Sequence, residues 1–483
     1  MLNSFAILTL GCKVNQYESQ QIRQLLEGSG LRLVDLADSP ELVVVNSCCV
    51  TLSASAKSRH LLHQAAKRNP QAIVLCGCLP AVQTDELTPL GENIHVVKDR
   101  CELAGTFARL ARTESTTPDS NRTKHPAITP ITPQNDAKVK SKNDLHRTQD
   151  LQPLASFHGQ TRAFLKIQDG CDSCCSYCII PTARPVVRFR NVDEILAEAT
   201  VLVAAGHKEI VLTGVHIGSY GQATTRRRHW PTAENPHLPA LLAQVSQVTN
   251  LARIRLSSLH PADVTPRLLD VFCNHPNIMP HLHLSLQSGS DAVLGRMARP
   301  YTADEFRAKI ALIKTRLDRP AITTDIIVGF PGETDADFEQ TVALAREAAF
   351  AKIHVFAFSP RKGTAAAIMR PRVAPPVVKT RSQTLRALDG DLQTQFRAQF
   401  LGETAQVLIE STQGPPAGRA ERYFEVRIGH GTNETNRTDR THPREDKSHE
   451  SHPSYQSYSL SPGDLVTVRL DQNARDAILG TII

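Results

Sequence analysis

The feature of this sequence that most constrains its fold is a strand-and-helix rhythm that runs from residue 156 to about residue 380. Short apolar, β-favouring runs alternate there with segments of helical periodicity such as "VDEILAEATVLVAAG". This alternation predicts parallel βα units. The six expected strands cover residues 163–168, 209–214, 253–258, 281–286, 323–330 and 353–359.

Six such units over roughly 220 residues predict a closed or partial barrel with its functional groups at the carboxyl ends of the strands. The unusual polar clusters of the sequence do follow the expected strands. They are "GCDSCCSYC", "TGVHIGSYG", "SLQSGSD" and "GFPGET". We therefore look for candidate site residues in these four stretches.

Two further regions flank the predicted barrel. Residues 1–112 contain short apolar runs separated by helix-length segments, which predicts a small parallel α/β domain. Residues 401–483 carry β-like runs such as "TAQVLIE" and "DLVTVRL", which predict a small β-barrel. The expected fold is thus α/β, with an N-terminal parallel α/β domain, a central partial (β/α)6 barrel over 156–400 and a C-terminal small β-barrel.

Two polar segments lack any pattern that could form a core. Residues 113–155 are rich in Thr, Pro, Asn, Asp and Lys, and they predict a disordered linker. Residues 430–459 predict a low-complexity insertion within the last domain. We expect both segments to be functionally neutral.

Composition places the chain among ordinary globular proteins. Hydrophobic residues make up 41% of the sequence, and no apolar run approaches the ~20 residues of a membrane helix. The N-terminus has no basic start and is unlike a signal peptide. The odd number of cysteines, 11, suits metal ligation in a reducing compartment better than a disulfide scaffold. We expect a cytoplasmic protein without membrane contacts, whose net charge of +7 permits RNA binding but does not require it.

Four cysteines in the stretch "GCDSCCSYC" can be grouped in two ways. As two CxxC pairs, Cys171/Cys174 and Cys175/Cys178, they would form a four-thiolate zinc site. As a CxxxCxxC triad, Cys171, Cys175 and Cys178 would bind three irons of a [4Fe–4S] cluster and leave the fourth iron open. The adjacent Cys174 and Cys175 tend to diverge and no spacer separates the pairs, so we favour the three-ligand cluster.

A second cysteine triad is predicted within residues 1–112. Cys12, Cys48 and Cys78 each follow the end of a different expected strand. Such positions converge on one rim of a parallel sheet. This arrangement suits another three-thiolate cluster with an open iron, although unrelated buried cysteines are the simpler alternative.

The remaining cysteines receive structural interpretations. Strand alternation predicts that Cys49 points away from Cys48. Cys76 lies inside an expected strand, and Cys101 and Cys273 lie on helical patterns, so all three are expected to be buried in the core.

The CxxxCxxC motif after the first barrel strand resembles that of the radical S-adenosylmethionine superfamily. The resemblance implies that the open iron binds the amino and carboxylate groups of S-adenosylmethionine. One electron from the cluster would cleave the C–S bond of this cofactor and produce a 5′-deoxyadenosyl radical. Tyr177 matches an aromatic position that packs near the adenine. Cys174 departs from the pattern, because relatives usually carry an aromatic residue there, and an extra thiol at this position is a spare ligand or, as we favour, inert.

Two triads in one chain resemble the methylthiotransferases. The stretches that carry this resemblance are "TLGCKVNQYES", "FLKIQDGCDSCCSYCIIP", "LTGVHIGSYG", "LHLSLQSGSDAVLGRM" and "DIIVGFPGET". The last domain resembles the TRAM module with which these enzymes hold RNA. The resemblance implies that the radical abstracts a hydrogen atom, that the N-terminal cluster supplies or carries the sulfur, and that a second S-adenosylmethionine supplies the methyl group. An unactivated C–H bond resists acid–base chemistry, so a cofactor must provide the radical.

Other strand-end residues are weaker cofactor-binding candidates. Gly214 and Gly329 would let the backbone approach the cofactor closely. Ser285 and Gln287 could hydrogen-bond its ribose or carboxylate. Ordinary turn glycines and polar rim residues explain these positions equally well. The basic run "RRRHW" at 226–230 is interpreted as a solvated loop rather than as a phosphate contact.

Three branches of the family share this machinery. They modify isopentenyladenosine in tRNA, an aspartate of a ribosomal protein, and threonylcarbamoyladenosine at tRNA position 37. The expected loop "GCKVNQYES" resembles the third branch, whereas the other two tend to have GCQMNxxDS and GCPKNxxDS. The resemblance assigns the choice of substrate to the loop residues Lys13, Val14, Asn15, Gln16 and Tyr17, with the other two branches as alternatives.

The implied partners are the anticodon loop of tRNA, with A37 extruded toward the barrel, and an electron donor such as flavodoxin or ferredoxin. We expect a monomer whose salt-sensitive tRNA binding weakens when residues 401–483 are removed. A radical enzyme acting on a small molecule or a protein, with the last domain used for oligomerisation, is one rival interpretation. An iron–sulfur or zinc protein with only a binding role is the other.

Overall fold

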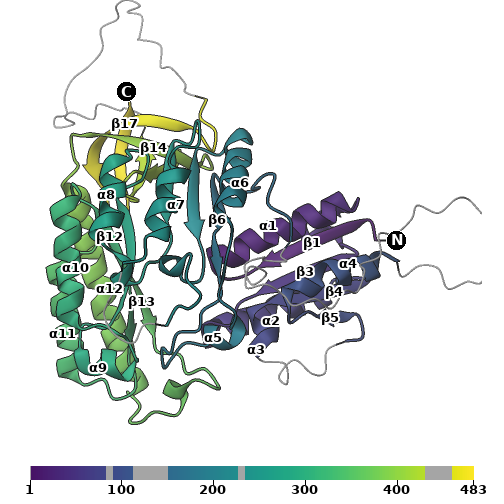
Figure 1. Ribbon diagram of the computed structural model, residues 1–483, viewed down its shortest axis with the longest axis horizontal. Coiled ribbons are helices and arrows are strands. Elements are labelled where there is room, and N and C mark those ends of the chain that lie inside the picture. The colour runs from purple at the N-terminus through teal and green to yellow at the C-terminus, as the bar shows by residue number, and fades with distance from the viewer. Residues whose placement is uncertain (1, 83–90, 113–150, 227–233, 430–458) are drawn as a thin grey trace, which may run out of the picture.

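The computed structural model describes residues 2–82, 91–112, 151–226, 234–429 and 459–483. It contains an N-terminal α/β domain, a central barrel and a small β-barrel at the C-terminus (Figure 1). The predicted fold class is confirmed.

The N-terminal domain is a five-stranded sheet in the order β2-β1-β3-β4-β5, and its strands are parallel. The central strand β3 has the sequence LVVVNS, and every one of its residues is buried. Continuous apolar strands of this kind occur where helices cover both faces of a parallel sheet. The strands are β1 (Ser4–Thr9), β2 (Arg32–Leu33), β3 (Leu42–Ser47), β4 (Ala72–Gly77) and β5 (Ile94–Val96), and the helices are α1 (Lys13–Gly28), α2 (Leu52–Ala66), α3 (Cys78–Val82) and α4 (Leu103–Arg112).

The central barrel contains the six strands that the sequence predicts. They are β6 (Arg162–Lys166), β9 (Glu209–Thr213), β10 (Arg253–Leu256), β11 (His281–Gln287), β12 (Ala321–Val328) and β13 (Lys352–Ala357). They form two parallel three-stranded sheets, β6-β9-β10 and β11-β12-β13, which single bridges join between β10 and β11. In the described part of the chain β6 and β13 are not paired, so the barrel is open along one side.

Helices pack on the outer face of this barrel and bury a continuous apolar core. The motif T-x-x-[DE] starts two of them, because Thr302 and Thr334 each accept a backbone N–H while the acid three residues later accepts theirs. The helices are α6 (Val192–Ala204), α7 (His237–Val245), α8 (Pro266–Asn274), α9 (Asp291–Arg296), α10 (Ala303–Arg316), α11 (Asp335–Ala348) and α12 (Pro375–Ala398). The short helix α5 (Ile180–Ala183) packs instead against α3 of the N-terminal domain. On the open side, α1 of the N-terminal domain packs against β6.

The C-terminal module is a closed barrel in the order β14-β15-β16-β18-β17. Its strands are β14 (Thr404–Ser411), β15 (Ala417–Ala420), β16 (Glu425–Ile428), β17 (Leu465–Asn473) and β18 (Ile478–Ile482). β15, with the sequence AGRA, has no apolar pattern and was not predicted. It is a strand because Gly418 lets it approach β14 closely, since a Cβ there would lie 2.1 Å from the Leu408 carbonyl oxygen.

The C-terminal module packs against the amino ends of the central strands. Arg253 and Arg255, both about 1% exposed, donate to backbone carbonyls of the module. The Arg255 guanidinium also pairs with Glu209 at 2.9 Å. The ring of Tyr423, from the module, stacks on His281 with a centroid separation of 4.3 Å. These contacts make the module part of the barrel's base.

The predicted linker differs from the structure at its end. Residues 113–150 lie outside the described residues, but 151–155 lie against α1 instead of being disordered. The Gln21 and Gln24 side chains donate to carbonyls of this stretch. The Leu154 side chain is buried. A stretch of five residues with one fully buried leucine is too short to show a hydrophobic periodicity, so the sequence could not predict that it packs against α1. The insertion predicted at 430–459 lies outside the described residues except for Ser459.

We expect Arg255→Met to destabilise the protein by about 3 kcal/mol, because the substitution leaves Glu209 charged and buried beside Arg253 alone. Arg427→Met is the matched control. Arg427 pairs with Glu425 and Asp476 at the surface, so its loss should cost less than about 1 kcal/mol. Urea unfolding followed by circular dichroism measures both, and equal midpoint shifts would contradict the role given to the Arg255 pair.

Candidate cluster and cofactor sites

The carboxyl edge of the N-terminal sheet brings the three predicted cysteines together. Ser47 and Gly77 are paired in register on β3 and β4, so Cys48 and Cys78, the next residues, leave adjacent strands side by side. Cys12 caps the start of α1, just after β1 on the other side of β3. The thiols are close enough that Cys12 and Cys78 both raise the pKa of Cys48, although burial raises it most.

The pKa of the Cys78 thiol is lowered to about 6. The largest cause is a hydrogen bond from Cys49, and the positive charge of Arg184 adds to it. Cys49, which strand alternation predicts to point away from Cys48, thus contacts the sulfur of another member of the triad, Cys78, because the chain leaves strand geometry after Ser47. A thiol with a lowered pKa is prepared to bind a metal, since the thiolate is the ligand form.

Arg184 connects this site to the barrel. It is 7% exposed and follows α5 in the barrel domain, yet its Nε donates to the Cys78 sulfur at 3.3 Å. Its other nitrogens donate to Glu18 at 3.0 Å, to Asp169 at 2.8 Å and to the Asn15 side chain at 2.9 Å. The guanidinium thus contacts a predicted cluster ligand, Cys78, and also Asp169 on the short strand β7 (Gln168–Asp169), which precedes the second cysteine triad.

Lys166 and Arg100 complete a buried charge network with these acids. Burial opposes ionisation of Asp169, but Arg184, Arg100 and Lys166 together hold its pKa well below the usual range. Asp169 is therefore charged in the interior, and the network closes the interface between the two domains.

The second triad lines a cavity of about 240 Å³ at the carboxyl end of the barrel. Cys171, Cys175 and Cys178 lie on the loop that follows β6 and all face this cavity. Burial and the neighbouring cysteines raise the pKa of Cys178 to about 12. Ser176 fastens the loop, because its N–H and hydroxyl both donate to carbonyls at the end of α9.

The predicted cofactor-binding residues divide into two groups. Tyr177, Ser285 and Gln287 line the same cavity as the cysteines. Gly214 and Gly329 do not. Their backbones make the expected close approaches, but to protein: a Cβ on Gly214 would lie 2.7 Å from the Gln168 carbonyl oxygen, and one on Gly329 would lie 2.4 Å from a Val378 methyl.

Sequence reasoning missed several groups that line the cavity. Arg299 donates to the Cys175 sulfur at 3.3 Å, and its guanidinium lies over the Tyr301 ring. The Thr225 hydroxyl lies 3.3 Å from the Cys171 sulfur, and the rings of His216 and His260 stack beside them. Arg299, Thr225 and His260 lie outside the stretches that the sequence analysis singled out, whereas His216 lies within one of them, "TGVHIGSYG".

The predicted substrate loop is helical, because residues 13–17 form the first turns of α1. Val14, Asn15 and Tyr17 are buried. The Asn15 amide donates to the carbonyls of Leu10 and Ser47, and the Tyr17 hydroxyl donates to Glu198 in the barrel. Lys13 and Gln16 are partly exposed, so any effect of the buried three on substrate choice would act through the position of Cys12 and α1.

The remaining cysteines are partly as predicted. Cys76 is buried within β4, as expected. Cys101 and Cys273 are exposed instead of buried, because each lies on the outer side of its helical segment. Cys174 is exposed at the mouth of the barrel cavity. In the basic run at 226–230, only Arg226 is described, and it bonds to Asp172 beside the cysteine loop.

Comparisons with known proteins agree with this geometry. Residues 165–345 match the Radical SAM superfamily, and residues 4–98 match the uncharacterized protein family UPF0004. The fold and cavity therefore define a radical S-adenosylmethionine domain. A solved structure of the radical S-adenosylmethionine methyltransferase TsrM from Kitasatospora setae is similar in fold, with a TM-score of 0.53 at 15% identity over 76% of this chain and 75% of that one.

The relatives narrow the class further. The chain is 34% identical to the threonylcarbamoyladenosine tRNA methylthiotransferase MtaB of Bacillus subtilis over 84% of each chain. It is 34% identical to MtaB of Thermotoga maritima over 85% of this chain and 87% of that one. It is 33% identical to the tRNA-2-methylthio-N(6)-dimethylallyladenosine synthase of Geobacter metallireducens over 84% and 86%. The chain belongs to the methylthiotransferase family of radical S-adenosylmethionine enzymes.

Family membership confirms the predicted cofactors, which are two [4Fe–4S] clusters and S-adenosylmethionine. The described residues fit them, since each site offers three cysteines on a cavity or sheet edge together with an arginine that donates to one of the sulfurs. Within the described ranges, no helix is long and apolar enough to span a membrane.

We expect Gly170→Ala to lower the iron content of anaerobically reconstituted protein from about eight toward about four atoms per chain. Gly170 precedes Cys171 at φ +78°, and a Cβ there would lie 1.9 Å from the Val186 carbonyl oxygen, so the substitution displaces the first ligand of the barrel triad. Gly159→Ala is the control, because Gly159 has φ +75° in open space and its substitution costs only about 1 kcal/mol of strain. Iron loss in both variants, or in neither, would refute this account.

Proposed function

We propose that this enzyme methylthiolates C2 of N6-threonylcarbamoyladenosine at position 37 of tRNA. Methylthiolation of tRNA is the activity that its relatives share. The choice of threonylcarbamoyladenosine as the modified nucleoside is supported by the sequence at the start of α1, "GCKVNQYES", which resembles that branch of the family. Isopentenyladenosine is the alternative, since synthases of that branch reach similar identity.

The proposal gives each cysteine triad a role. Cys171, Cys175 and Cys178 would hold the cluster that binds S-adenosylmethionine, with Tyr177, Ser285 and Gln287 around the cofactor. When bound, the barrel cluster and S-adenosylmethionine would supply the radical, a second S-adenosylmethionine the methyl group, and the N-terminal cluster would supply or carry the sulfur. A separate triad at the edge of the N-terminal sheet, Cys12, Cys48 and Cys78, would hold the second cluster.

The chain's own charged groups organise this chemistry. Arg184 would keep the N-terminal thiolates at a fixed distance from the barrel loop, because it bonds to Cys78 and to Asp169. Arg299 would neutralise charge at Cys175, and its position is held by the Tyr301 ring. Both arginines place a positive charge next to a cysteine sulfur, Arg184 in the buried interior and Arg299 in a partly buried position, and such a charge would favour a net anionic cluster.

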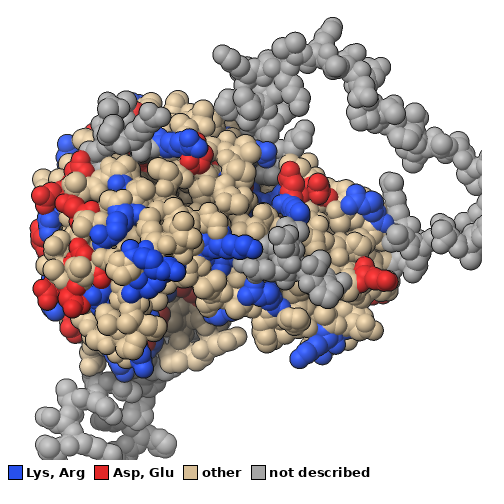
Figure 2. Space-filling view, turned by 90° about the horizontal axis from the view of Figure 1, so that it is seen from below, with Lys and Arg blue, Asp and Glu red and all other residues tan. Residues whose placement is uncertain are grey.

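A basic segment adjoins both sites and provides a surface for RNA. Residues 358–374 contain four basic residues and no acidic one. The four are Arg361, whose side chain is buried, and Lys362, Arg370 and Arg372. Of these, Lys362, Arg370 and Arg372 are exposed. The Ala366 N–H donates to the Ser176 carbonyl in the cysteine loop, while the Arg361 side chain reaches α2. Figure 2 shows Lys and Arg across the middle of the face seen from below, with a concentration of Asp and Glu at its left edge.

The C-terminal module lies at the other end of the barrel. The eight residues of β12 separate it from the cysteine end, a span of about 26 Å at 3.3 Å per residue. A tRNA held by both surfaces must lie along the barrel. Deleting residues 401–483 would also uncover Arg253 and Arg255, so point substitutions test RNA binding more cleanly than the truncation.

The activity is tested with reconstituted enzyme and two tRNAs, one carrying threonylcarbamoyladenosine and the other isopentenyladenosine. Nucleoside mass spectrometry is expected to show the methylthio product only from the first. Cys48→Ala should still produce 5′-deoxyadenosine but no methylthio product, whereas Cys175→Ala should produce neither. Product from the isopentenyladenosine tRNA alone would move the enzyme to the alternative branch.

We expect the triple variant Lys362→Gln, Arg370→Gln, Arg372→Gln to bind tRNA more weakly. The slope of log affinity against log salt should fall by about 1 for each phosphate that the variant no longer neutralises. Arg307→Gln with Arg316→Gln on α10 is the control, because these arginines pair with exposed acids on the outer helices. Titrations over a salt series measure the slopes, and identical slopes in all three proteins would exclude the segment from the RNA surface.

A further inference from the structure

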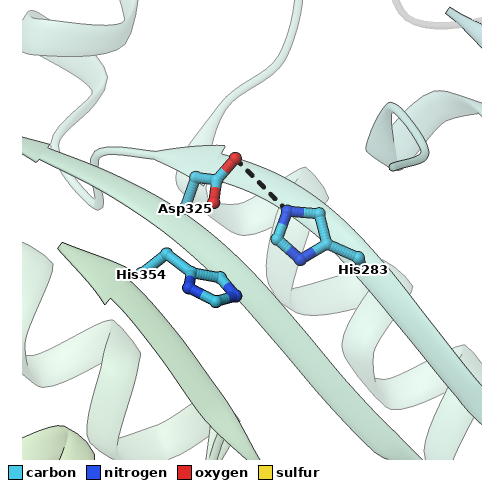
Figure 3. Close-up of side chains that lie close together, drawn as sticks. All are labelled: His283, Asp325 and His354. Atoms are coloured by element: carbon cyan, nitrogen blue, oxygen red, sulfur yellow. Dashed lines mark ion pairs between the residues drawn. The ribbon is translucent and has the colours of Figure 1, made fainter. Parts of the chain in front are cut away.

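Two histidines and an aspartate lie together on three neighbouring strands of the barrel (Figure 3). His283 is on β11, Asp325 on β12 and His354 on β13. Asp325 and His354 are paired in register, and His283 is paired with Thr323, two residues before Asp325. Parallel strands therefore carry the three side chains to one patch of one sheet face.

This patch faces the interior of the barrel. Side chains two residues apart on a strand point to the same side, and Ser285, two residues after His283, lines the cavity that holds the barrel cysteines. His281, two residues before His283, stacks on Tyr423 of the C-terminal module. The group thus lies on the inner wall between the module and the cysteine cavity, about 7 Å from Ser285 along β11.

The geometry of the three side chains is that of a ligand set. His283 Nε2 lies 3.2 Å from an Asp325 carboxylate oxygen. One ligand atom from each of the three residues lies within 4.8 Å of the others. A cation bound at about 2.1 Å to each would hold them about 3.4 Å apart, so small side-chain rotations suffice to bind it.

A neighbouring hydroxyl orients one of the ligands. The Thr323 Oγ lies 2.9 Å from His283 Nδ1. A hydrogen bond at this nitrogen leaves Nε2 directed toward Asp325 and His354, which is the outer-shell support that metal-ligating histidines usually have. An ion pair between His283 and Asp325 alone would not require a second imidazole, yet His354 extends one toward it from the edge strand.

We propose that His283, Asp325 and His354 bind one divalent transition-metal cation of the Zn²⁺ or Fe²⁺ class. Two imidazoles and one carboxylate match the ligand preference of these ions and not that of Mg²⁺ or Ca²⁺, which prefer oxygen ligands. Three protein ligands leave at least one coordination position for water or for an oxygen of a molecule in the barrel. This site uses no residue of the two cysteine triads, and it stands whichever nucleoside is the substrate.

The test uses full-length enzyme with both iron–sulfur clusters reconstituted, so that the triad cysteines are already occupied. The protein is dialysed against micromolar Zn²⁺, desalted and analysed for zinc and iron per chain by mass spectrometry. We expect Asp325→Asn and His354→Ala each to retain about one zinc less per chain than the unmodified enzyme. Thr323→Val should bind zinc about tenfold more weakly, because it keeps all three ligands and removes the hydrogen bond that orients His283, together with a 3.3 Å contact to His281 Nε2.

His60→Ala is the matched control. It removes a histidine from the surface of α2, where the ring contacts the Gln64 side chain, and it should retain the zinc of the unmodified enzyme. Asp325→Asn preserves the shape of the side chain, and an unchanged iron content and circular dichroism spectrum report an intact fold. Equal zinc content in the unmodified enzyme, Asp325→Asn and His354→Ala, all folded, would overturn the proposal.

Discussion

The buried ion pairs around Arg184 are the interaction on which the rest of this structure depends. Glu18 comes from the N-terminal domain, and Asp169 and Arg184 come from the barrel domain. Burying such charges is costly, and removing one partner leaves another uncompensated, at a cost of about 3 to 5 kcal/mol. The network therefore favours a single arrangement of the two domains. Because Arg184 also touches Cys78, that arrangement sets the relation between the two cysteine sites.

Much of the fold could be predicted because local patterns and tertiary structure agree. β3 and β12 are rich in Val, Ile and Thr, and burial on both faces follows from that composition. β15 could not be predicted, since a strand of sequence AGRA exists only through its neighbours. The docking of residues 151–155 also depends on partners, in this case glutamine side chains of α1 that are more than 100 positions away.

The sequence could predict which cysteines lie together in the two candidate sites, but not the other side chains that surround them. Cysteines that follow parallel strands share an edge of the sheet, so the meeting of Cys12, Cys48 and Cys78 could be predicted from their positions after three strands. The other triad lies on a single loop, and its spacing can be read directly from the sequence. Arg299, Thr225 and Arg184 reach the sulfurs from loops distant in sequence, and only the folded chain brings them there. Gly214 and Gly329 were predicted to let the backbone approach the cofactor, whereas the atoms that lie close to them in the structure belong to the protein, and the sequence does not distinguish these two cases.

The packing of α1 against β6 has a consequence for how the chain is made. During synthesis on the ribosome, α1 emerges well before β6, and the segment between the two domains must follow before they can meet. Until then the nascent N-terminal domain presents Glu18 and Tyr17 to solvent instead of to their barrel partners. When β6 forms, α1 packs against it beside its otherwise bare edge, and a covered edge is protected from pairing with other chains.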